Sequence, residues 1–177
     1  MVHTDTTGVL DVVVLGGGGH VGLPLSLALA DVGLRVGIFD INEATLEQIG
    51  RGEMPFLENG ADALLPQVLE TGRLELGSSA AMIERAETVV LVIGTPVDEF
   101  LGPSMRVFER AVDQIAPHLQ DGALLVLRST VYPGTTAHVA AALEERGCRV
   151  DVAFCPERTA GDRGPVDHPR QAGVVTQ

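Results

Sequence analysis

The sequence predicts a single α/β domain, a doubly wound parallel sheet with helices on both faces. Short apolar runs rich in Val, Leu and Ile alternate with longer segments of helical character along most of the 177 residues. Glycine or proline ends many of these segments. Aromatic residues make up only 3% of the chain and Trp is absent. The core is therefore expected to be aliphatic, as in buried parallel sheets.

The expected strands are short apolar runs that end at glycine or at polar residues. The first, Val9 to Leu15, carries one charge, Asp11, and leads into four glycines. The second, Arg35 to Phe39, ends at Asp40. Further strands are expected at Arg73–Leu76, Thr88–Ile93, Ala123–Leu127 and Arg149–Phe154. Because helices alternate with these strands, the crossover connections make the sheet parallel.

Helices are expected between the strands. The first, Val21 to Val32, ends at Gly33 and has Pro24 in its first turn, where a missing N–H costs little. A short helix over Ser79–Ala86 has Ser78 or Ser79 as its N-cap. The others are expected at Glu43–Ile49, Ala61–Glu70, Pro103–Leu119 with an early end at Pro117, and Thr135–Arg146.

These elements divide the chain into three parts. Residues 1–8 are expected to be a flexible N-terminus, residues 9–160 the folded domain, and residues 161–177 an irregular tail. The tail contains three glycines and two prolines and shows no helical or strand periodicity. An apolar content of 45% is typical of a globular rather than a disordered chain.

The charge balance narrows the classes of partner. The net charge is −12, and all twelve basic residues are Arg. A strongly acidic surface argues against nucleic acid and anionic membranes as partners. The absence of Lys excludes a P-loop or a Schiff base within this chain. No secretory signal or long apolar run is visible, so a cytoplasmic protein with reduced thiols is expected.

A glycine turn follows the first strand. Among Gly16 to Gly19, only one register completes the pattern G-x-G-x-x-G, through Gly17, Gly19 and Gly22. In a strand–turn–helix context, these glycines permit a tight turn, close approach of a pyrophosphate, and close packing of helix on strand. The pyrophosphate is then expected at the helix N-terminus, where free N–H groups and the helix dipole favour an anion.

Asp40 lies at the end of the second strand, where a carboxylate can bind the ribose hydroxyls of a dinucleotide. A carboxylate there repels a 2′-phosphate, which favours NAD over NADP. The alternative is a purely structural glycine turn with Asp40 as a solvated strand end.

Later strand ends carry further motifs: IGTPVDE at 93–99, LRSTVYPGTT at 127–136 and FCPER at 154–158. Together with GGGHVGLP at 17–24, they resemble the UDP-glucose/GDP-mannose dehydrogenase family. The resemblance spans roughly Val9 to Ala160. It implies a Rossmann-type fold and NAD-dependent oxidation of the C6 alcohol of a nucleotide sugar to a carboxylate. Full-length relatives are expected to dimerise.

The resemblance also assigns roles to individual residues. Thr130 and Glu157 are the expected catalytic residues, Thr130 helping to hold a water and Glu157 acting as base or water-positioning carboxylate. The alternatives are local turn bonding for Thr130 and a surface pair with Arg158 for Glu157. The expected cofactor-binding residues are Gly17, Gly19, His20, Val21, Gly22, Asp40, Gly94, Thr95, Pro96, Ser129 and Thr130.

The cysteines are not expected to act as nucleophiles. The family's catalytic cysteine lies beside a lysine in a C-terminal half, and neither residue has a counterpart here. Cys155 is interpreted as a buried thiol at a strand end, and Cys148 as a packing residue. No metal site is expected, because their spacing fits no zinc pattern.

Two departures from the family pattern stand out. Thr45 replaces a lysine that is usual in the family, which implies weaker NAD binding. After Ala160 the family pattern is lost, and we hypothesise a frameshift or aberrant truncation. The chain alone is therefore expected to be inactive.

Three functions remain open at this point. The first is the NAD-binding domain of a nucleotide-sugar 6-dehydrogenase acting on a UDP- or dTDP-hexose. The second is a stand-alone NAD sensor without chemistry. The third is a related β-hydroxyacid or 6-phosphogluconate-type dehydrogenase, which predicts a catalytic lysine that this chain lacks.

Overall fold

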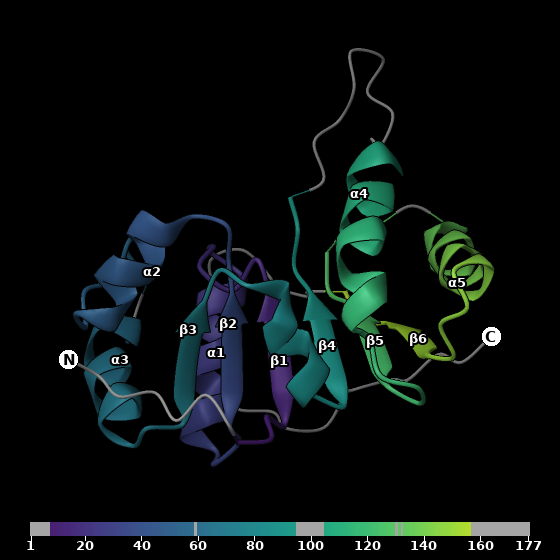
Figure 1. The fold of residues 1–177 in the computed structure, drawn as a ribbon. Coiled ribbons are helices and arrows are strands. Elements are labelled where there is room, and N and C mark those ends of the chain that lie inside the picture. Colours follow the sequence, from purple (N-terminus) through teal and green to yellow (C-terminus); the bar gives the residue numbers. More distant parts are fainter. Residues whose placement is uncertain (1–7, 59, 95–104, 130, 132, 157–177) are drawn as a thin grey trace, which may run out of the picture.

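The computed structural model describes residues 8–58, 60–94, 105–129, 131 and 133–156. Its centre is a six-stranded, fully parallel sheet in the order β3-β2-β1-β4-β5-β6 (Figure 1). The strands are β1 (Val12–Leu15), β2 (Val36–Phe39), β3 (Leu74–Gly77), β4 (Thr88–Leu91), β5 (Leu124–Leu127) and β6 (Asp151–Phe154). The chain reverses its direction of winding between β1 and β4, so the doubly wound sheet expected from the sequence is confirmed.

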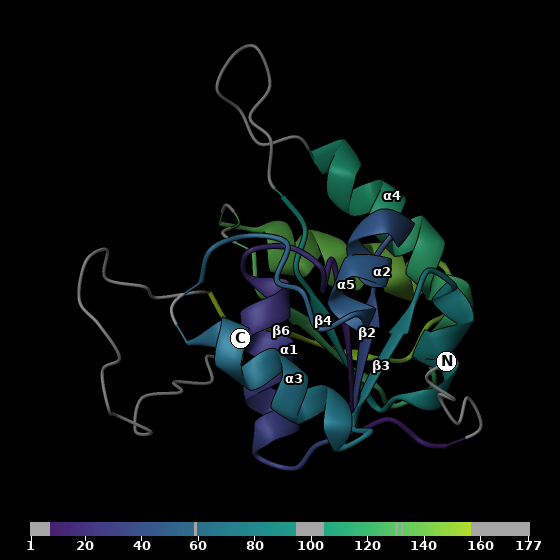
Figure 2. The same cartoon turned by 90° about the vertical axis from the view of Figure 1, so that its left-hand side faces the viewer.

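Helices cover both faces of the sheet, as Figure 2 shows in edge view. The helices are α1 (Gly22–Asp31), α2 (Glu43–Gly50), α3 (Ala61–Glu70), α4 (Met105–Ile115) and α5 (Thr135–Glu145), with 3-10 helices η1 (Ala80–Arg85) and η2 (Ala116–His118). Helices α1 to α3 share one buried cluster with Val12 and Val14 of β1. Helices α4 and α5 and the 3-10 segments share the other with Val13 and Leu15. Because successive side chains of a strand point to opposite faces, β1 contributes to both cores.

Two expected helices differ in detail from the observed ones. The segment after Ser79 is a 3-10 helix rather than an α-helix, capped by the Ser79 hydroxyl, which accepts the Ala81 N–H. Helix α4 ends at Ile115, two residues before Pro117, because proline disfavours helical conformation in the residue that precedes it. Within the part of the chain that the structure describes, no helix has both the length and the apolar character needed to cross a bilayer.

Candidate functional site

The glycine turn begins where β1 ends, at the carboxyl edge of the sheet. Gly16 has a φ of +72°, a backbone conformation that favours glycine. The Gly16 N–H donates to the carbonyl of Phe39 at 2.9 Å, and the Gly19 N–H donates to the Gly16 carbonyl at 3.2 Å. The left-handed residue of the turn is therefore Gly16, one position before the glycine to which the sequence pattern assigns the tight turn.

Close packing explains two other glycines. A Cβ on Gly17 would lie 2.8 Å from both the Ile38 side chain and the Val14 carbonyl oxygen. A Cβ on Gly22 would lie 2.4 Å from the carbonyl oxygen of Gly16. These distances are shorter than any van der Waals contact. The turn can therefore pack against β1 and β2 only because Gly17 lacks a side chain, and the start of α1 can approach the turn only because Gly22 lacks one. The packing role expected for Gly22 is confirmed.

Gly19 is different, because no contact within the described part of the protein requires a glycine there. A Cβ there would meet no described atom nearer than 3.4 Å, and its φ is not positive. Gly94, just beyond β4, is similar: an added Cβ would meet no described atom within 4 Å. Both glycines lie beyond the carboxyl ends of β1 and β4, the strands that flank the change in winding. They leave backbone accessible at the place where doubly wound sheets bind ligands.

No side chain among the described residues caps the N-terminus of α1. Its N-cap residue, Val21, offers no hydrogen-bond acceptor, and no acidic residue occupies the first turn. Within the first turn, the Leu23 N–H already donates to the Gly19 carbonyl at 2.9 Å and Pro24 has no N–H, so this end offers an anion the partial positive charge of the helix and the amides that precede Leu23. The arrangement can therefore accept an anion such as a pyrophosphate.

Asp40 faces the glycine turn. Its Oδ2 accepts the backbone N–H of Gly18 at 3.0 Å, and its Oδ1 accepts the N–H of Asn42 at 3.0 Å. Asn42 in turn caps α2, accepting the Thr45 N–H at 3.2 Å. Each carboxylate oxygen has a second lone pair, so Asp40 can still accept two hydroxyl groups from a ligand. The carboxylate thus links the turn after β1 to the start of α2.

An aromatic contact extends the site beyond the sequence motifs. The ring of His20 stacks on Phe56, with centroids 4.0 Å apart and planes 18° from parallel. Phe56 belongs to the loop between α2 and α3, which therefore lies against the glycine turn. Sequence reasoning missed Phe56, because no motif signals a contact between two loops 36 positions apart.

The residues that follow β4 and β5 complete the described part of the site at the carboxyl ends of the strands. The Ser129 hydroxyl donates to the Ile93 carbonyl at 2.7 Å and accepts the Ile93 N–H at 2.9 Å. Ser129 and Gly94 therefore follow neighbouring strands, as expected. The predicted site residues Thr95, Pro96, Thr130 and Glu157 lie outside the described residues.

Sequence comparison identifies the protein family to which a chain with this site belongs. The profile described as "UDP-glucose/GDP-mannose dehydrogenase family, NAD binding domain" matches residues 11–174.

The chain belongs to the UDP-glucose/GDP-mannose dehydrogenase family. The matched part of that family is its NAD-binding domain, so the cofactor of the domain is NAD. The match continues beyond Ala160, where the sequence alone indicates an irregular tail.

Individual members of the family show the same relationship. The chain is 29% identical to UDP-glucose 6-dehydrogenase of Rickettsia typhi over 142 residues, which is 80% of this chain and 33% of the relative. It is 30% identical to UDP-N-acetyl-D-mannosamine dehydrogenase of Pyrococcus horikoshii, over 82% of this chain and 36% of the relative. A solved UDP-glucose dehydrogenase from Pyrobaculum islandicum superposes with a TM-score of 0.78 at 29% identity, covering 89% of this chain and 38% of that one. The chain therefore spans about a third of the length of the curated relatives it matches.

The two cysteines of this family member lie apart from the glycine turn. Both are free thiols: Cys148 is half-buried and donates to the Ala116 carbonyl at 3.4 Å. Cys155 is exposed, so its interpretation as a buried thiol is wrong. The reason is its position, since it follows β6, the last strand at one edge of the sheet.

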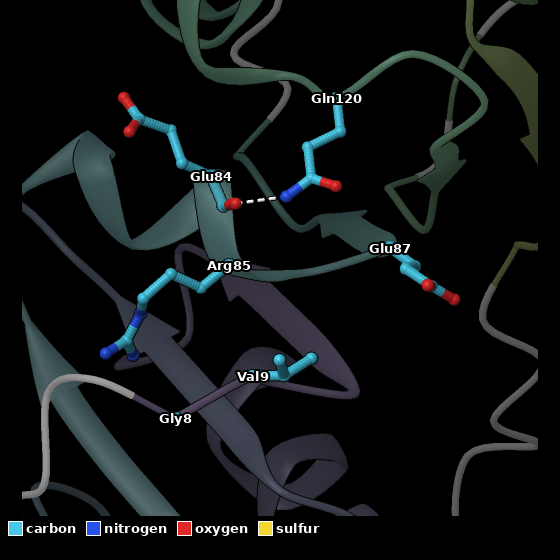
Figure 3. A pocket seen from close by; sticks show the side chains of 6 residues that line it. All are labelled: Gly8, Val9, Glu84, Arg85, Glu87 and Gln120. Carbon is cyan, nitrogen blue, oxygen red and sulfur yellow. Dashed lines mark hydrogen bonds between the residues drawn. The ribbon is translucent and has the colours of Figure 1, made fainter.

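A pocket at the amino ends of the strands is not part of this site. Figure 3 shows its lining residues, which include Val9 before β1 and Glu87 before β4. The Gln120 amide reaches across it to the backbone carbonyl of Glu84. None of the lining residues is a predicted site residue, and ligands of doubly wound sheets bind at the carboxyl ends of the strands.

Proposed function

We propose that the chain is the NAD-binding domain of a nucleotide-sugar 6-dehydrogenase. The observation that carries the proposal is the position of Asp40, whose carboxylate accepts the Gly18 N–H within the glycine turn. A carboxylate at this point lies beside both the helix N-terminus that would hold a pyrophosphate and the space for the neighbouring ribose. When bound, NAD supplies the hydride acceptor for oxidation of an alcohol.

Different residues at the carboxyl ends of the strands would contact different parts of NAD. The turn residues Gly17, Gly19, His20, Val21 and Gly22 would surround the pyrophosphate, and Asp40 would accept the ribose hydroxyls. The nicotinamide half would lie against the ends of β4 and β5, at Gly94, Thr95, Pro96, Ser129 and Thr130. The open surroundings of Gly19 and Gly94 support this arrangement, since both leave room for a ligand.

Thr130 and Glu157 are proposed as the catalytic residues of this domain. Thr130 would help to hold a water molecule, and Glu157 would orient that water or accept its proton, which requires a carboxylate within hydrogen-bond reach. Both assignments rest on the STVYPGT and CPER motifs.

The substrate is proposed to be a UDP- or dTDP-hexose. The relatives named above are dehydrogenases of UDP-linked sugars, which supports this substrate class. The 177-residue chain by itself is proposed to be inactive, because its sequence has no lysine to accompany a catalytic cysteine. A stand-alone NAD sensor is the alternative, and the threonine and glutamate motifs at the strand ends favour the enzyme, because a sensor has no need of them.

Isothermal titration with NAD tests the cofactor assignment. The chain is expected to bind NAD with a Kd of roughly micromolar to millimolar and to bind NADP at least about tenfold more weakly, because Asp40 repels a 2′-phosphate. Asp40→Asn is expected to weaken NAD binding and to reduce the difference in affinity between NAD and NADP. Absence of NAD binding by the folded chain would contradict the proposal.

Turnover is measured separately, by NADH formation with UDP-glucose, UDP-N-acetylhexosamine and dTDP-glucose. No NADH formation above background is expected from the chain alone. Sustained NADH production would show that the inactivity part of the proposal is wrong while leaving the cofactor assignment in place.

A further inference from the structure

We propose that Arg128 and Ser129 are positioning residues that hold the carboxyl ends of β4, β5 and β6 in place for cofactor binding. The proposal rests on the proposed function, because its consequence is measured as NAD affinity. It assigns an indirect role to two side chains that lie beside the cofactor motifs.

Ser129 joins β5 to the end of β4. The backbone ladder between these strands reaches Arg128, whose N–H donates to the Leu91 carbonyl at 3.0 Å. Ile93 lies two residues after Leu91, and there the Ser129 hydroxyl replaces the backbone as the partner. It accepts the Ile93 N–H at 2.9 Å and donates to the Ile93 carbonyl at 2.7 Å. One side chain thus satisfies both backbone groups of Ile93, beyond the end of the strand itself. Gly94 is the residue that follows this bridge directly.

The same geometry limits what Ser129 can do directly. A serine hydroxyl has one proton to donate, and here that proton goes to the Ile93 carbonyl. The Ser129 side chain therefore has no donor left for a cofactor. Its effect on NAD binding is indirect, through the position of the β4 end.

Arg128 joins β5 to the end of β6 on the other side. Its Nη1 donates to the carbonyls of Cys155 at 3.3 Å and Pro156 at 3.2 Å, and lies 3.6 Å from the Cys155 Sγ. The backbone ladder at this point is the Cys155 N–H to the Leu127 carbonyl, at 3.0 Å. The guanidinium continues that ladder by two carbonyl groups, so it holds Cys155 and Pro156, the two residues that follow β6.

The unpaired part of the same guanidinium supports a positioning role. The Arg128 Nε is buried and has no hydrogen-bond partner among the described residues. A buried donor without a partner destabilises the fold. The side chain is thus held at the carbonyls of the β6 end even though this leaves one of its own donors unpaired.

Adjacent residues of one strand end therefore reach the two neighbouring strands, Ser129 toward β4 and Arg128 toward β6. Residues that set the geometry of a binding edge raise affinity by removing the cost of ordering it when the ligand arrives.

The test for Ser129 compares three variants by NAD titration and thermal unfolding. Ser129→Ala is expected to weaken NAD binding by about tenfold, because small displacements of binding groups have large effects. Ser129→Thr keeps the hydroxyl and is expected to restore most of the affinity. The matched control is Thr71→Ala at the opposite edge, whose hydroxyl likewise donates to a carbonyl, Val68 O at 2.6 Å, and accepts an N–H, that of Arg73 at 3.2 Å. It is expected to lower the unfolding temperature without changing the Kd for NAD.

The test for Arg128 compares Arg128→Met with Arg128→Lys. The methionine variant is expected to weaken NAD binding several-fold, and lysine to recover part of the loss, since one ammonium can still donate to the Cys155 and Pro156 carbonyls. If Ser129→Ala and Arg128→Met both bind NAD as the wild type does, the proposal is overturned. If the wild type itself binds no NAD, the proposed function has failed instead.

A measurement on the unaltered chain covers the case of a variant that does not fold. The Ile93 amide is expected to exchange its hydrogen as slowly as amides within the β4 ladder, because the Ser129 hydroxyl accepts it. Exchange of the Ile93 amide at the rate of an unprotected loop would exclude the Ser129 bridge.

Discussion

At the residue scale, the glycines of the turn after β1 serve different purposes that the motif alone does not separate. Gly16 provides a positive φ, and Gly17 and Gly22 provide space for close packing. Gly19 does neither, since its surroundings in the protein would admit a methyl group. The glycine pattern therefore combines residues needed for folding with one that is free to serve a ligand.

This difference predicts that two alanine variants of one motif will behave differently. Gly22→Ala places a Cβ 2.4 Å from the Gly16 carbonyl oxygen, a backbone atom that cannot move away cheaply. We expect it to lower the free energy of unfolding by about 2 kcal/mol or more, as overpacking does. Gly19→Ala is expected to change stability by less than about 1 kcal/mol and to abolish NAD binding. Urea unfolding and NAD titration of both variants measure the two effects; a Gly19→Ala chain with unchanged Kd would contradict a pyrophosphate at this residue.

At the element scale, the sequence predicts most helices and strands because their apolar patterns are local. Helix α3 has the predicted bounds, α1 is one residue shorter than predicted at each end, and α2 is one residue longer than predicted at its C-terminal end. Contacts between elements are another matter. The bond from Asp40 to Gly18 depends on the register in which Leu15 pairs with Phe39, and the stacking of His20 on Phe56 depends on how two loops meet. Neither follows from local periodicity.

The opposite ends of β5 and β6 are joined by a different kind of contact. The Arg149 guanidinium, through its hydrogen bond and its charge, holds the pKa of the Asp121 carboxyl below its usual value of 3.8. A lowered folded-state pKa stabilises the fold above that value, and the contribution is lost as the pH falls below it. Because both side chains are exposed, solvent screening keeps this contribution small.

Helix α3 lacks one backbone hydrogen bond because it contains a proline, and the cost to stability can be measured. Pro66 lies inside the helix, where it cannot donate to the Asp62 carbonyl, and its side chain is exposed. Pro66→Ala is expected to stabilise the chain by about 1–2 kcal/mol, after allowing for the greater freedom of the unfolded alanine chain. Thermal unfolding measures the gain, with Gln67→Ala at the next exposed position as the control, expected to change stability by less than about 0.5 kcal/mol. A lower unfolding temperature for Pro66→Ala would show that the proline fits this helix without cost.

At the scale of the whole molecule, the sheet separates two cores that share only its strands. One core packs β1 against α1 and α3, and the other packs it against η1, α4 and α5. The change in winding between β1 and β4 places the proposed adenosine half of NAD at the ends of β1 and β2 and the nicotinamide half at the ends of β4 and β5. A bound dinucleotide would therefore connect the two halves of the sheet.

This arrangement predicts how ligands of different length stabilise the chain. A ligand at about 100 times its Kd stabilises the folded state by about 2.7 kcal/mol, which raises the unfolding temperature by roughly 5–10 °C for a chain of this size. NAD is expected to give that shift, whereas AMP at the same concentration gives a smaller one because it reaches only the ends of β1 and β2. Nicotinamide mononucleotide is expected to give the smallest shift, because it lacks the adenosine half whose ribose Asp40 is proposed to bind. Thermal scans with the three ligands at equal concentration make the comparison, and the Gly19→Ala chain is the control that should not respond to NAD. An AMP shift as large as that of NAD would mean that the ends of β4 and β5 contribute nothing to binding, and a site extending across both halves of the sheet would have to be abandoned.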